Sequence, residues 1–81
     1  MKACEESVAL IAQISENIKK KGYYLLADRK IELITQHAPN EQLKMHRLKS
    51  FAHLHHWQVE VRHHGHSALF YPPEHPPHEM N

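Results

Sequence analysis

The chain has 81 residues, 41% of them hydrophobic and 23% charged, and its ten Lys or Arg residues against nine Asp or Glu residues leave a formal net charge of +1. This length allows one small domain, and this composition excludes the charge-rich, aromatic-poor profile of a disordered chain. A single cysteine excludes an internal disulfide and indicates a reducing, cytoplasmic location, and no apolar run approaches the roughly 20 residues of a membrane helix.

The first segment has the pattern of an amphipathic helix over residues 4–21. Its apolar stripe recurs at helical spacing and consists of Cys4, Val8, Ile11, Ile14 and Ile18. The last turn carries three lysines, which face the helix dipole favourably, and Gly22 can adopt the positive φ that ends a helix. A short domain with a small core often completes itself by dimerisation, so this stripe is the predicted homodimer surface, with the hairpin's edge strand as the alternative.

Residues 23–40 contain a helix whose start is ambiguous. Residues 23–26 read either as a short buried strand or as the first turn of a helix that continues to residue 37, and periodicity does not separate the two. The helix must end before Pro39, because the residue before a proline is pushed out of helical geometry. Asn40 is a good N-cap for the next helix. The linker lacks the glycine often found in a helix-turn-helix turn.

A third helix over residues 41–55 is followed by a hairpin. Met45, Leu48 and Phe51 follow helical spacing, and after them apolar and polar residues alternate from Trp57 onward, as is typical of a half-buried strand. A two-residue turn at residues 64–65 would place residue 61 opposite 68 and residue 59 opposite 70, which gathers the apolar side chains on one face. We predict Trp57 as the core anchor at the junction.

These elements predict an α+β fold: three helices followed by a C-terminal two-stranded β-hairpin. In this order the architecture resembles a winged-helix domain, with residues 23–26 as its small third strand. We expect the domain to span residues 1–71 and a Pro- and His-rich flexible tail to follow over residues 72–81.

The charge is distributed unevenly along the chain. Residues 19–62 hold nine Lys or Arg residues and four acids, a net of +5, whereas residues 1–18 and 63–81 each carry −2. A basic middle favours a phosphate-binding surface, and the resemblance implies a third helix in the major groove with the hairpin tip near the backbone. We therefore predict a non-catalytic protein that binds double-stranded DNA, such as a transcriptional or mobile-element accessory factor. The predicted contacts are Lys44, Arg47, Lys49 and Arg62.

Two other functions stay open from the sequence. One is a homodimeric protein-interaction module with no nucleic-acid role. The other is a transition-metal-binding protein, because the chain has ten histidines and imidazole suits zinc, nickel and copper. His63 and His66, which face each other across the predicted turn, form the candidate metal site. A complete set of ligands is missing, so we expect no resident cofactor and only adventitious zinc or nickel.

The sequence carries no catalytic motif. It has only two glycines, and neither a glycine-rich phosphate loop nor a Gly-x-Ser-x-Gly sequence is present. Cys4 lies on the apolar stripe of the first helix, where a small buried residue is the ordinary interpretation. We therefore predict no enzymatic activity and assign no catalytic residue.

Overall fold

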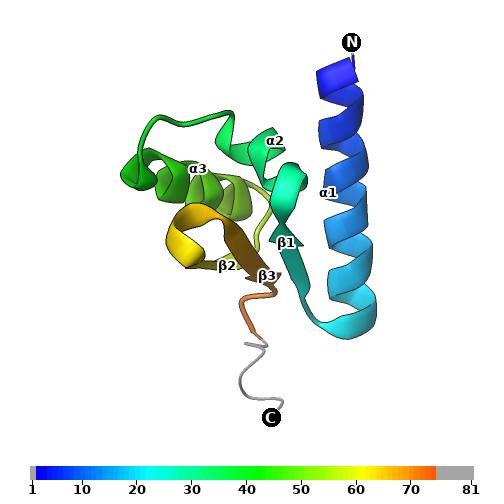
Figure 1. Cartoon of the computed structure of the whole chain (residues 1–81). Coiled ribbons are helices and arrows are strands. Elements are labelled where there is room, and N and C mark those ends of the chain that lie inside the picture. Colours follow the sequence, from blue (N-terminus) through cyan, green and yellow to red (C-terminus); the bar gives the residue numbers. More distant parts are fainter. Residues whose placement is uncertain (1, 75–81) are drawn as a thin grey trace.

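The structure, a computed structural model, describes residues 2–74, and its elements follow the order α1, β1, α2, α3, β2, β3 (Figure 1). The helices are α1 (Lys2–Lys21), α2 (Glu32–Thr35) and α3 (Glu41–Leu54), and the strands are β1 (Tyr24–Ala27), β2 (Gln58–Arg62) and β3 (Ser67–Tyr71). Two 3₁₀ turns, η1 (Asp28–Ile31) and η2 (His63–Gly65), complete the chain path. The predicted α+β class is confirmed. The sheet, however, has three antiparallel strands and not two.

The third strand, β1, resolves the ambiguous segment after α1. It pairs antiparallel with β3, with Leu26 opposite Ala68, so β3 lies in the centre of the sheet between β1 and β2. Gly22 ends α1 with a φ of 88°, and its amide donates to the Ile18 carbonyl at 2.9 Å, as its position in the sequence predicts. Pairing with a distant strand, rather than local periodicity, decides the conformation of β1.

The register of the β2–β3 hairpin agrees with the sequence-based prediction, but its loop is longer. Val61 lies opposite Ala68 and Val59 opposite Phe70. The last pair of the ladder is Arg62 with Ser67, so residues 63–66 form a four-residue loop instead of a two-residue one. The cause is the backbone of the loop, since residues 63 and 64 have left-handed φ values of 54° and 56° and cannot extend the ladder.

The core lies between the inner face of the sheet and the three helices. Its fully buried large side chains are Ile14, Leu26, Leu48 and Phe70, together with Thr35. The stripe predicted on α1 is divided by this packing: Ile14 is buried and Ile18 packs against the core, whereas Val8 is 66% exposed. Leu10, which the stripe did not include, is buried instead. The side chain of Cys4 and the tail residues 75–81 lie outside the described part of the structure.

The outer face of the sheet is more apolar than the alternating pattern suggests. Leu69 on the central strand is buried, because Leu25 of β1 and Glu60 of β2 flank it in the same row. Leu25 itself is half exposed. Among residues 2–74, no helix is both long enough and apolar enough to cross a lipid bilayer.

Candidate nucleic-acid interface

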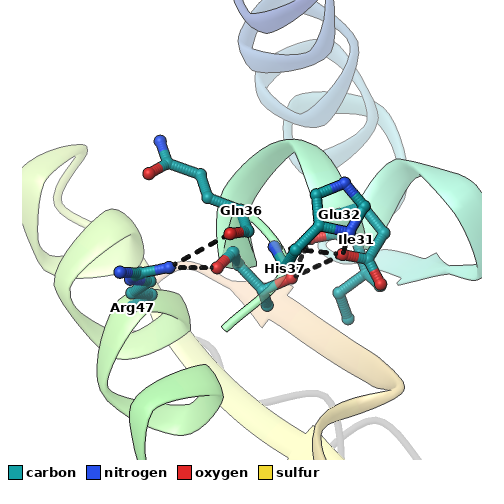
Figure 2. A network of polar contacts seen from close by, with 6 residues as sticks. Ile31, Glu32, Gln36, His37 and Arg47 are labelled. Carbon is teal, nitrogen blue, oxygen red and sulfur yellow. Dashed lines mark hydrogen bonds and ion pairs between the residues drawn. The ribbon is translucent and has the colours of Figure 1, made fainter. Parts of the chain in front are cut away.

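The position of α3 depends on polar contacts with the end of α2 (Figure 2). Arg47, on α3, donates from Nη1 to the carbonyl of Thr35 at 2.6 Å and to that of Gln36 at 3.3 Å. These carbonyls lie at the C-terminus of α2, where the last backbone acceptors have no partner within the helix and a cation is favourable. Arg47 therefore stabilises the end of α2 and joins it to α3.

This arrangement explains how the chain turns between α2 and α3 without glycine. Gln36 and His37 both have left-handed φ values, 52° and 54°, at positions where glycine is the usual residue. Besides Arg47, the carboxylate of Glu32 holds the turn by accepting from the backbone amide of His37 at 3.2 Å, with the His37 Nδ1 at 3.1 Å (Figure 2). The linker has no glycine, and the side chains of Arg47 and Glu32 hold its two left-handed residues instead.

The first turn of α3 begins as the sequence predicts. Asn40 lies just before the helix in extended conformation, and its Oδ1 accepts from the backbone amide of Leu43 at 2.8 Å. This side chain satisfies one of the amides that a helix N-terminus leaves unpaired. Both ends of the α2–α3 turn are therefore held by side-chain hydrogen bonds.

The four predicted contact residues have different surroundings in the structure. Lys44 is half buried and its aliphatic stem lies beside the hairpin loop, 3.2 Å from where a Cβ on Gly65 would be. Lys49 is exposed on α3, and neither lysine has a hydrogen-bond or ion-pair partner among the described residues. Arg62 is paired with Glu60 at 2.6 Å on the outer face of β2. Arg47 is occupied by the end of α2, so its visible role is to position α3.

A continuous polar surface on α3, which we call the α3 outer face, was only partly predicted. Its exposed members follow helical spacing away from the core and are Gln42, His46, Lys49, Ser50 and His53. No member is a carboxylate, and the helix's one acid, Glu41, lies in the first turn with its Oε1 3.3 Å from the Nδ1 of His64. Sequence reasoning did not assign His46 or His53 to this surface, although the helical spacing from Gln42 was a sufficient signal.

The histidines of the hairpin loop make separate contacts. The His63 Nδ1 lies 2.8 Å from the Ser67 Oγ, and the His66 backbone amide donates to the His63 carbonyl at 3.1 Å. Among the side chains that the structure describes, which do not include those of Cys4 and Asp28, no three His, Cys, Asp or Glu residues come together as a group that could hold a metal ion. The His63–His66 metal site stays a prediction, and the loop geometry shows these residues joined through their backbone.

An aromatic cluster supports the C-terminal end of α3. Phe51 packs edge-on against Phe70 with ring centroids 5.8 Å apart, and the His55 ring lies 4.8 Å from Phe51 and 5.2 Å from Trp57. Trp57 in turn meets Phe70 edge-on at 6.1 Å. The prediction of Trp57 as the core anchor at this junction agrees with these contacts.

A shallow groove, which we call the α3–β2 groove, lies beside this cluster. It runs between the C-terminal half of α3 and the edge strand β2, and its lining residues are Lys49, Ser50, Ala52, His53, Leu54, Trp57, Gln58 and Val59. Lys49, Ser50 and His53 thus belong both to this groove and to the α3 outer face.

Comparisons of the chain with family models, curated proteins and solved structures find no match. The function of the protein is therefore inferred from the geometry of this interface.

Proposed function

We propose that this protein is a non-catalytic, winged-helix-like DNA-binding protein that places the α3 outer face in the major groove of double-stranded DNA. The observation that carries the proposal is the composition of this face, which offers hydrogen-bonding and cationic side chains without a carboxylate. Glutamine and lysine are side chains that read adenine and guanine in the major groove, and each is present there as Gln42 and Lys49. Such a protein would act in the cytoplasm as an accessory factor of transcription or of a mobile element.

The order of the elements supports the same proposal. Three helices and a β2–β3 hairpin, with β1 completing a sheet of order β1–β3–β2, resemble a winged-helix domain. In that arrangement the hairpin loop is the wing, which approaches the phosphate backbone. Lys44 beside the loop and Arg62 at its start would then contact phosphates, and Arg62 would exchange Glu60 for a phosphate oxygen on binding. Arg47 would act on the interface as a positioning residue.

The proposal is tested by fluorescence anisotropy with a labelled mixed-sequence duplex. Binding at about 50 mM salt should weaken steeply as salt rises, because each neutralised phosphate releases counterions. Lys49→Ala should lower the affinity about tenfold. Lys20→Ala is the matched control, since Lys20 is equally cationic and exposed but lies in the last turn of α1, paired with Glu16 at 2.9 Å. Absence of binding at low salt, or equal losses for the two variants, would contradict the proposal.

A homodimeric interaction module is the second candidate function. The observation in its favour is Val8, which is 66% exposed on α1, with the half-buried Ile11 beside it on the same side of the helix. An isologous pairing of two α1 helices would cover both side chains. Val8→Glu should then shift the molecule from dimer to monomer in sedimentation equilibrium, whereas a monomeric protein would show no change in mass.

A further inference from the structure

We infer that the α3–β2 groove binds an unpaired nucleotide of single-stranded nucleic acid. The inference rests on the proposed nucleic-acid function and assigns it a second, distinct ligand: a single-stranded end or overhang rather than the duplex. The side chains of the groove combine an aromatic ring, a cation and an amide.

The aromatic component of the groove is Trp57, and its ring is held in place before any ligand binds. Phe51 and Phe70 each lie 6.1 Å from it between ring centroids, and His55 lies 5.2 Å away at an interplanar angle of 30°. The indole is nevertheless only half buried and forms part of the groove wall. A ring fixed in this way loses little conformational freedom when a base stacks on it, which favours affinity.

One apolar side chain of the groove, that of Leu54, is not part of the hydrophobic core. Leu54, the last residue of α3, is 72% exposed and lines the groove together with Ala52 and Val59. An exposed large aliphatic side chain next to an aromatic ring offers a second apolar surface for a flat ligand. This arrangement suits a base inserted between a tryptophan and an aliphatic side chain.

The polar side chains of the groove select an anionic ligand with hydrogen-bonding edges. Lys49 and His53 lie one turn apart on α3, and Gln58 begins the edge strand β2 opposite them. The lining residues include no carboxylate, so a phosphate meets a cation and no repelling charge. The Gln58 amide, which both donates and accepts, can bond the edge of a base. An acidic peptide would use the cation and leave the indole and the amide without a matching group.

The groove also continues the α3 outer face. Since Lys49, Ser50 and His53 belong to both surfaces, a strand that leaves a duplex bound along α3 passes directly into the groove. A duplex with a short single-stranded overhang therefore fits the two surfaces together better than a blunt duplex does.

The chain has one tryptophan, so its fluorescence reports on the groove directly. We would titrate the full-length protein with an oligothymidylate of about ten nucleotides, a blunt duplex and the same duplex with a thymidine overhang, following both Trp57 emission and anisotropy. The oligothymidylate and the overhang should quench Trp57, and the overhang should tighten binding by about tenfold over the blunt duplex, as one stacked base allows.

Two exposed glutamines supply matched variants that spare the core. Gln58→Ala, in the groove, should reduce quenching and remove most of the overhang preference while blunt-duplex affinity stays unchanged. Gln42 lies on the α3 outer face but outside the groove. Gln42→Ala should therefore weaken duplex binding and leave the overhang preference intact.

The possible outcomes separate this inference from the proposed function. Duplex binding without quenching or overhang preference would overturn the inference and leave the proposed function standing. Failure to bind any nucleic acid would overturn both. Quenching by an acidic peptide but not by oligothymidylate, or an emission change that depends only on protein concentration, would assign the groove to a peptide or to a second copy and overturn the inference.

Discussion

Replacing Arg47 by methionine should destabilise the whole fold, because its guanidinium is the partner of two backbone carbonyls at the end of α2. Methionine keeps an unbranched apolar stem on α3 and removes only the charged donors. The contact with the Thr35 carbonyl is the stronger one, at 2.6 Å and partly buried, whereas the contact with the Gln36 carbonyl is longer and exposed.

The size of the effect follows from these two contacts. A hydrogen bond to a charged group contributes about 1.5–3 kcal/mol, and an exposed bond of 3.3 Å adds little. We therefore expect the free energy of unfolding to fall by about 2 kcal/mol. For a domain of this size that corresponds to a decrease of roughly 10 °C in Tm.

The assay is urea and thermal unfolding followed by circular dichroism, with Lys49→Met as the control. Lys49 lies on the same helix and carries the same charge, but it is exposed and has no partner among the described residues, so its replacement should change stability by less than about 0.5 kcal/mol. If Arg47→Met and Lys49→Met unfold at the same temperature, the positioning role of Arg47 is wrong. If Arg47→Met keeps full stability but loses DNA affinity, Arg47 is a direct contact residue, as the sequence pattern suggested.

Two further predictions concern residues in the left-handed region, and they have opposite signs. Gly65→Ala should lower stability by about 1–2 kcal/mol, because Gly65 has a φ of 91° and a Cβ there would lie 3.2 Å from the Lys44 side chain; unchanged urea unfolding would contradict this. Gln36→Gly should leave stability unchanged or raise it by up to about 1 kcal/mol, because Gln36 has a φ of 52° at the end of α2 and its side chain is exposed. A clear loss of stability for Gln36→Gly would show that the unfolded chain's entropy outweighs the relief of backbone strain.

Much of the fold could be predicted because its signals are local. The lysines and Gly22 at the end of α1, the Asn40 cap and the alternation in β2 each act over a few residues, and the structure has each of them as expected. The candidate interface was predicted less well. The helical spacing predicted both Lys49 and Arg47 on the exposed side of the third helix. In the structure Lys49 is exposed on the α3 outer face, whereas the guanidinium of Arg47 bonds the end of α2. A cation's partner is visible only once the distant backbone that accepts from it is in place.

The amino-acid sequence by itself determined the α+β class, the C-terminal end of α1, the cap of α3 and the hairpin register, since φ preferences, capping and strand alternation are properties of neighbouring residues. Only the tertiary structure decided that residues 24–27 form a strand, because that depends on pairing with β3. The same holds for the burial of Leu10 in place of Val8, which depends on which side of α1 packs against β1, β3 and α2. The basic middle segment and the high histidine content were evident from the start. Their division into an outer face, a groove and a turn-stabilising arginine arises from contacts between segments that are distant in the chain.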